Sequence, residues 1–242
     1  MIKSKSLQIS AGEIRYLQSS PRDRDLVFIH GGFGDAGIIS MLEKHFGREY
    51  RITAPYLPGH GSFDLGKNAS YQDIVGTISE FLTKLELTDY VLMGHSLGGR
   101  LALDMALRGD LRAQSEILIA PMLFSITASL TQITANIMGD YVSDLGVSGR
   151  GISLRNETLY ARFKNFQQIW RLVTSVGKVE SITLPIPTTI IWGRGDSVLP
   201  LDMNLPIISR IKGAKLETYV GGHYWLFKDG SMEIIDRLIT EK

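Results

Sequence analysis

The sequence predicts an α/β fold, with a mostly parallel central sheet, helices on both faces and a helical cap insertion. Short, continuously apolar runs are typical of strands that are buried on both faces of a parallel sheet. Segments with helical spacing of apolar residues alternate with these runs, which favours strand–helix–strand units. The runs are residues 26–29, 90–93, 117–120 and 190–192.

The elements before the nucleophile region follow from local patterns. Residues 7–10 and 13–18 flank Ala11-Gly12, which predicts an antiparallel hairpin ahead of the parallel strands. Ser70 precedes a helical pattern and Asp73 follows three residues later, the spacing of a capping box. The apolar face of this helix is formed by Tyr71, Ile74, Val75, Ile78, Phe81, Leu82 and Leu85.

The alternation of strands and helices stops between residues 121 and 185. We therefore predict an α/β core of residues 1–120 and 186–242 and a helical cap, or lid, of residues 121–185. A Gly/Ser-rich stretch, residues 146–151, separates two helical patterns in this cap. The first pattern contains Ile126, Leu130, Ile133 and Ile137, and the second contains Leu159, Phe163, Phe166, Trp170 and Val173.

Composition excludes several classes of protein. The net charge of +1 gives no general attraction to nucleic acid or to an acidic membrane. The absence of cysteine removes disulfides, thiolate metal sites and a cysteine nucleophile. No stretch approaches the roughly 18 apolar residues of a membrane span, and the first residues lack the apolar core of a signal peptide. We expect a cytoplasmic protein with a small-molecule substrate and with no nucleic-acid or membrane partner.

The strongest chemical signal is the run Gly94-His95-Ser96-Leu97-Gly98-Gly99. It follows an apolar run and precedes a helical pattern, the strand–turn–helix context of a nucleophile elbow. Residues two before and two after the nucleophile must be small, because neighbouring backbone passes close to a sharp, strained turn. The helix N-terminus just beyond also favours negative charge near Ser96.

Other motifs also follow apolar runs. The glycine-rich turn of residues 30–34 aims backbone N–H groups into a site, where such donors stabilise a developing oxyanion. Asp196 ends a late strand in residues 192–196, and His223 follows the next strand after Gly221-Gly222. Because the carboxyl ends of parallel strands meet at one edge, Asp196 and His223 are expected to face the crevice where such sheets bind ligands.

Together these motifs resemble the α/β-hydrolase superfamily over residues 24–120 and 186–240. The matching pieces are His30-Gly31-Gly32, Pro58-Gly59-His60-Gly61, Gly94-His95-Ser96-Leu97-Gly98-Gly99, Gly193-Arg194-Gly195-Asp196 and Gly222-His223. The resemblance implies a serine hydrolase with Ser96 as nucleophile, His223 as general base and Asp196 as the acid that orients the base. It also implies an oxyanion hole formed by backbone N–H groups of Leu97 and Gly32, with Phe33 a less favoured contributor.

The remaining histidines are interpreted structurally. We expect His30 and His60 to hold loops together and His95 to pack beside the elbow, with its side chain away from the reacting atoms. No group of His, Asp and Glu has the spacing of metal ligands, so neither a metal nor a cofactor is predicted.

The cap residues point to a pocket for an acyl or aryl group. The simplest hypothesis is a carboxylesterase that cleaves esters of small to medium size. The candidate pocket residues are Met122, Leu123, Phe124, Ile126, Phe163 and Trp170.

Two alternatives remain open on the sequence. Residues 96–103 are similar to the elbow of the menaquinone-pathway lyase that eliminates pyruvate, in which an arginine at the position of Arg100 meets the substrate carboxylate. This similarity favours a lyase or a C–C hydrolase that acts on a carboxylated substrate. The other interpretation is that Arg100 only pairs with a nearby acid. Some hormone receptors and stress regulators also keep this fold and its triad and act by binding a ligand and a partner.

Overall fold

The computed structural model describes residues 1–32, 34, 36–60, 69–109, 111–145, 166–228 and 230–240. The strands are β1 (Lys3–Ile9), β2 (Gly12–Gln18), β3 (Arg24–Ile29), β4 (Tyr50–Pro55), β5 (Tyr90–His95), β6 (Ala113–Ile119), β7 (Ile182–Gly193) and β8 (Ile211–Tyr219). The helices are α1 (Ile39–Phe46), α2 (Tyr71–Lys84), α3 (Leu97–Arg108), α4 (Leu130–Leu145), α6 (Phe166–Ser175), α7 (Leu201–Ile208) and α8 (Ser231–Thr240). Short 3₁₀ turns are η1 (Ala36–Ile38) and η2 (Trp225–Phe227).

The strands form one eight-stranded sheet in the order β1-β2-β4-β3-β5-β6-β7-β8. β1 and β2 form the predicted antiparallel hairpin, and β2 pairs with β4, also antiparallel. The pairs from β4 to β8 are all parallel. The structure therefore confirms the predicted fold class.

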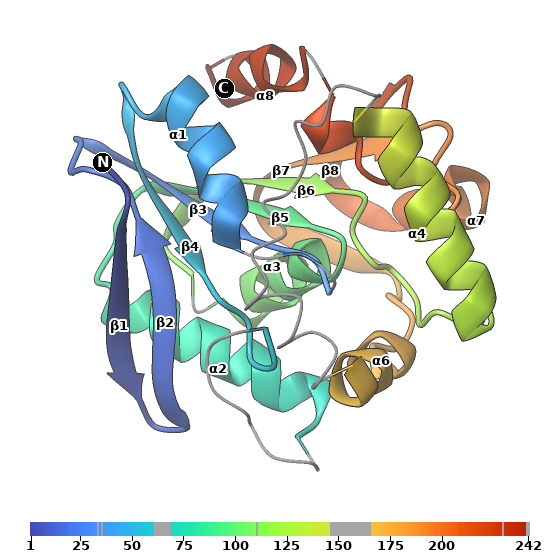
Figure 1. The fold of residues 1–242 in the computed structure, drawn as a ribbon, viewed down its shortest axis with the longest axis horizontal. Coiled ribbons are helices and arrows are strands. Elements are labelled where there is room, and N and C mark those ends of the chain that lie inside the picture. The colour runs from blue at the N-terminus through green and yellow to red at the C-terminus, as the bar shows by residue number, and fades with distance from the viewer. Residues whose placement is uncertain are drawn as a thin grey trace.

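Helices cover both faces of the sheet (Figure 1). Leu92 of β5 belongs to a buried apolar cluster that includes side chains of α2 and α3. Its neighbours Val91 and Met93 point to the opposite face and join a second cluster with side chains of α1 and α8. Successive side chains of a strand point to opposite faces, so a continuously apolar strand serves both layers.

The predicted capping box of α2 is present. The Ser70 hydroxyl accepts the backbone N–H of Asp73 at 3.2 Å, and the Asp73 carboxylate accepts the backbone N–H of Ser70 at 2.7 Å. These two bonds satisfy donors that an uncapped helix leaves free.

β7 is longer than its apolar run predicts. It begins at Ile182, and its pairing with β8 shifts register between Thr183 and Thr188. Pro185 and Pro187 lie inside that shift, where a residue without an N–H is tolerated. The two prolines broke the apolar pattern and concealed the first half of the strand.

α4 and α6 lie between β6 and β7 in the chain, inside the segment predicted as a cap. The predicted glycine-rich stretch of residues 146–151, together with Leu159 and Phe163, lies outside the described residues. The domain boundaries at 121 and 185 stay a prediction. Over the ranges described above, no helix has both the length and the apolar character needed to cross a bilayer.

The backbone of α3 at Gly98 packs directly against the backbone at the end of β3. A Cβ placed on Gly98 would lie 2.2 Å from the carbonyl oxygen of Ile29 and 2.5 Å from that of His30. Real Cβ atoms do not approach a carbonyl oxygen so closely, so any side chain here forces the elbow away from β3.

We expect Gly98→Ala to lower the free energy of unfolding by about 3 kcal/mol or more, because both facing atoms are backbone and neither can move aside cheaply. The matched control is Gly76→Ala in α2, where the nearest atom to an added Cβ is the Arg108 guanidinium at 3.8 Å. Alanine is favoured over glycine inside a helix by up to about 1 kcal/mol, so this variant should be neutral or stabilised. Urea unfolding followed by circular dichroism measures both, and equal stabilities would contradict the expectation.

Candidate active site

Ser96 occupies the turn between β5 and α3. Its φ of 56° and ψ of −118° lie in a region that residues with a side chain rarely adopt, so the surrounding structure must impose this conformation. The Ser96 N–H donates to the carbonyl of Ile119 at 2.9 Å, which ties the turn to β6. A Cβ on Gly94 would lie 2.5 Å from the Gly98 carbonyl, so the small residues predicted around the nucleophile are required by the geometry of the turn.

The structure brings Asp196 and His223 together from the loops that follow β7 and β8. His223 Nδ1 lies 2.8 Å from Asp196 Oδ2, and both side chains are buried. The other carboxylate oxygen, Oδ1, accepts the backbone N–H groups of Val198 at 2.9 Å and Leu199 at 2.7 Å. Since an ionised carboxylate only accepts, the proton lies on Nδ1 and leaves Nε2 free to accept another.

Glycines allow these two loops to meet. A Cβ on Gly193 would lie 2.3 Å from the carbonyl oxygen of Gly222, and the N–H of Gly195 donates to the carbonyl of Gly221 at 2.8 Å. The loop that carries Asp196 and the loop that carries His223 therefore touch through backbone atoms alone.

Ser96 and His223 line one cavity of about 40 Å³. The other residues of its wall come from the turn after β3, from the segment after β6, from α4 and α6, and from the loops after β7 and β8. They are Gly31, Gly32, Gly34, His95, Met122, Ile126, Ile137, Val173, Val198, Tyr224 and Phe227.

Gly32, one of the two residues favoured as oxyanion donors, lines this cavity, whereas Leu97 is not among the lining residues. A Cβ on Gly32 would lie 3.6 Å from Leu97 Cδ2, and Leu97 is the first residue of α3, where the backbone N–H has no partner within the helix. His60 Nε2–H donates to the carbonyl of Gly32 in a short hydrogen bond, and His30 Nε2 accepts the N–H of Leu57 at 3.2 Å. These contacts confirm that His30 and His60 hold loops together. Phe33, the third predicted oxyanion donor, lies outside the described residues.

Comparison with known proteins identifies the family of this chain. A sequence model of the alpha/beta hydrolase family matches residues 26–232. The chain belongs to the alpha/beta hydrolase family.

Individual relatives of this family are distant. A pimeloyl acyl-carrier-protein methyl ester esterase of Nitrosospira multiformis is 33% identical over 111 residues, which are 43% of this chain and only 40% of that protein. A 2-hydroxy-6-oxo-6-phenylhexa-2,4-dienoate hydrolase of Burkholderia cepacia is 23% identical over 248 residues, covering 87% of this chain and 84% of that protein. The solved structure of a bacterial membrane phospholipase A superposes with a TM-score of 0.79 at 18% identity, covering 99% of this chain and 86% of that one, which shows the shared fold.

The segment between β6 and β7 lines the cavity with residues other than the aromatic ones that the sequence indicated. Met122 and Ile126, both named from the sequence, line the cavity. Phe124 and Trp170 pack against the main apolar cluster and are not among the lining residues. Phe163 lies outside the described residues.

Sequence reasoning missed Ile137 of α4 and Val173 of α6 as lining residues. Both belong to helical stripes that the sequence did identify, but the stripe alone does not say which of its members face a cavity.

Arg100 lies one turn below Ser96 on α3. Its guanidinium donates to Asp104, at 3.1 and 3.0 Å, and to the backbone carbonyls of Met122, Gly177 and Val176. It is buried and is not among the residues that line the cavity. This arrangement matches the interpretation in which Arg100 pairs with a nearby acid, and it also ties α3 to the chain between β6 and β7.

His95 packs against His223, with ring centroids 4.9 Å apart. Its Nε2–H donates to the backbone carbonyl of His223 at 2.9 Å. Burial, reinforced by the neighbouring imidazole of His223, lowers the pKa of His95 to about 3. His95 is therefore neutral at physiological pH and holds the base loop by a hydrogen bond, and it also lines the cavity, closer to the reacting residues than the sequence indicated.

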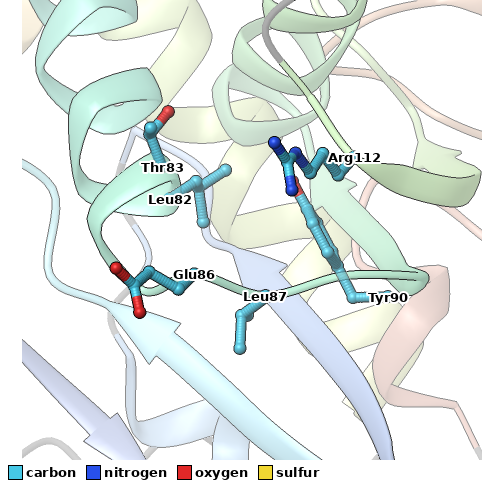
Figure 2. Close-up of a pocket in the computed structure, with 6 residues that line it drawn as sticks. All are labelled: Leu82, Thr83, Glu86, Leu87, Tyr90 and Arg112. Atoms are coloured by element: carbon cyan, nitrogen blue, oxygen red, sulfur yellow. The ribbon is translucent and has the colours of Figure 1, made fainter.

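A larger hollow of about 360 Å³ lies elsewhere, at the opposite end of β5 from Ser96. Figure 2 shows the Arg112 side chain alongside Tyr90, the first residue of that strand. The other lining residues are Leu82, Thr83, Glu86 and Leu87, so none of the three predicted triad residues reaches it. We place the candidate active site at the smaller cavity because Ser96 and His223 line it.

The neutral state of His95 makes stability depend on pH. The pKa of His95 is about 3 in the folded chain and about 6.5 in the unfolded one, so between these two pH values the unfolded chain binds this proton and the folded chain does not. The free energy of unfolding should therefore fall as the pH falls from about 6.5. For His95→Gln, which keeps an N–H donor without a titrating ring, the loss between pH 7.5 and 5.0 should be smaller by about 2 kcal/mol. Urea unfolding at the two pH values measures this difference, and equal losses would show that His95 takes up a proton in the folded state.

Proposed function

We propose that this chain is a serine hydrolase that cleaves carboxylic esters of small to medium size through an acyl-enzyme on Ser96. The observation that carries the proposal is the single cavity lined by Ser96, at the strained turn, and by His223, which is paired with Asp196. Membership of the alpha/beta hydrolase family supports the same chemistry.

The proposed reaction assigns one role to each of these groups. Ser96 Oγ attacks the ester carbonyl carbon while His223 Nε2 takes its proton. Backbone N–H groups of Leu97 and Gly32 hold the oxyanion of the tetrahedral intermediate, and Asp196 stabilises the charged imidazole. His223 then protonates the departing alcohol, and water activated by the same imidazole hydrolyses the acyl-enzyme.

The cavity supports a short acyl chain. Its volume of about 40 Å³ is well below the roughly 300–1,000 Å³ of sites for drug-sized ligands. Met122, Ile126, Ile137, Val173 and Val198 give it an apolar wall, which suits an alkyl group.

Replacing the nucleophile tests the proposal directly. Wild type should hydrolyse para-nitrophenyl acetate or butyrate and form a covalent adduct with a fluorophosphonate. Ser96→Ala should lose about 10⁴–10⁶ in turnover and all labelling, because the attacking oxygen is gone. Release of para-nitrophenolate and intact-protein mass spectrometry measure both.

The control is Ser143→Ala, since Ser143 is an exposed serine of α4, and it should behave as wild type. A wild type that neither hydrolyses these esters nor reacts with the fluorophosphonate would refute the proposed function.

The size of the cavity predicts the acyl-chain profile. Ile137→Ala shortens a side chain that lines the cavity and so enlarges it, and the ratio of kcat/KM for octanoate to that for acetate esters should rise by about 10-fold, the scale of one or two methylene contacts. Met138→Ala removes an exposed side chain from the next position of α4 and should leave this ratio unchanged. Equal profiles for the two variants would mean that Ile137 does not bound the acyl group.

A second candidate is a hydrolase that cleaves a carbon–carbon bond of a 6-oxo-dienoate. The relative named for such a substrate aligns over 87% of this chain, which favours this reading. Adding 2-hydroxy-6-oxo-6-phenylhexa-2,4-dienoate and following the loss of its dienoate absorbance separates the two: rapid decay with slow ester hydrolysis would put this candidate first.

A further inference from the structure

One face of α4 is directed at the loops that carry the acid and the base. Asn136, Asp140 and Asp144 are spaced four residues apart, so they line up along one side of the helix. α4 also contacts η2, the turn that follows His223 in the chain (Figure 1).

Asp140 bridges the two loops. Its Oδ2 accepts the backbone N–H of His223 at 2.8 Å and the backbone N–H of Ser197 at 2.9 Å. Its Oδ1 accepts the hydroxyl of Ser197 at 2.7 Å. A single carboxylate thus holds His223 and the residue next to Asp196.

Asp144 and Asn136 extend this contact on either side. Asp144 accepts the N–H of Gly222, at 2.8 and 3.0 Å, and the N–H of Tyr224 at 3.0 Å, so it grips the backbone before and after His223. Asn136 Nδ2–H donates to the carbonyl of Ser197 at 2.6 Å.

Both carboxylates are buried, with relative exposures of 6% for Asp140 and 5% for Asp144. Burial of a carboxylate is costly unless hydrogen bonds replace its hydration, and here backbone N–H groups of the two loops do so. Burial raises the pKa of Asp144, whereas the bonds from Gly222 and Tyr224 and the charge of Lys228 act in the opposite direction.

The glycines before His223 make this approach possible. A Cβ on Gly222 would lie 2.7 Å from Asp140 Cγ, and a Cβ on Gly221 would lie 3.2 Å from Asp144 Oδ1. The Gly221-Gly222-His223 motif therefore fits the helix carboxylates as well as the neighbouring acid loop.

We propose that Asp140 is a positioning residue, which fixes His223 relative to Asp196 from the helix α4. The inference rests on the proposed function, in which these two residues form the acid–base pair. Asp140 is not among the residues that line the cavity, so it acts through the two loops and not on the substrate. α4 then has two roles: Ile137 lines the cavity, and Asp140 holds the loops that carry the acid and the base.

The test compares Asp140→Ala with Asp140→Asn, with Ser143→Ala as the control on the exposed side of the same helix. Asp140→Ala leaves the N–H groups of His223 and Ser197 without their acceptor, so kcat should fall by about 10²-fold with KM within twofold. Asparagine keeps one oxygen for both N–H groups and an amide that can donate to the Ser197 hydroxyl, so its kcat should stay within about threefold of wild type. All assays are run at least 20 °C below the melting temperature of each variant.

Two results would overturn the proposal. The first is a kcat for Asp140→Ala equal to that of Ser143→Ala, or a loss of kcat that disappears on cooling, as expected of a residue that only stabilises the fold. The second needs no variant: amide hydrogen exchange in wild type should show protection of the N–H groups of His223 and Ser197, and exchange as fast as at exposed amides would refute the contact. Because this second readout does not depend on turnover, the two failures can be distinguished: an inactive wild type would refute the proposed function, whereas fast exchange would refute the contact of Asp140 with the two loops.

Discussion

The site depends on backbone segments that touch at the carboxyl edge of the sheet. The carbonyls of Ile29, at the end of β3, and of His30 lie against Gly98, and the carbonyl of Gly222 lies against Gly193. Parallel strands bring the ends of β3, β5, β7 and β8 to one edge, where a side chain at Gly98 or Gly193 would collide with the neighbouring backbone. The missing Cβ atoms let the elbow reach β3 and let the acid loop bond directly to the base loop. These contacts hold the loops of Asp196 and His223 together and set the turn that carries Ser96 against β3.

Much of this could be predicted from the sequence because it is encoded over short distances. The elbow needs small residues at fixed positions around Ser96, and a buried strand needs an unbroken apolar run. The capping box needs only Ser70 and Asp73, three residues apart. Asp196 and His223 were identified because each follows a strand of the same parallel sheet, so the topology alone places them at the same edge.

What could not be predicted depends on which elements pack together. Arg100 and Asp104 share a helix face, but only the fold shows that Met122, after β6, and Gly177, after α6, supply the carbonyls that accept the other hydrogen bonds of Arg100. Asp140 and Asp144 look like ordinary exposed acids in the sequence, and they are buried because the His223 loop lies on that face of α4. In the same way, a helical stripe identifies Ile137 and Val173 as inward-facing without saying whether core or cavity lies opposite.

The two adjacent imidazoles of the site are kept in different roles by their surroundings. His223 has a carboxylate at Nδ1, whereas His95 has only a backbone carbonyl at Nε2. In the proposed reaction His223 becomes charged when it takes the serine proton, and a second positive charge 4.9 Å away would oppose that step. Burial keeps His95 neutral. Asp196 therefore pairs with the imidazole of His223, while the imidazole of His95 supports the loop by its hydrogen bond. Asp140 holds the N–H of His223 and His95 holds its carbonyl, so the base is fixed on both sides of its own backbone while its ring stays free to exchange a proton.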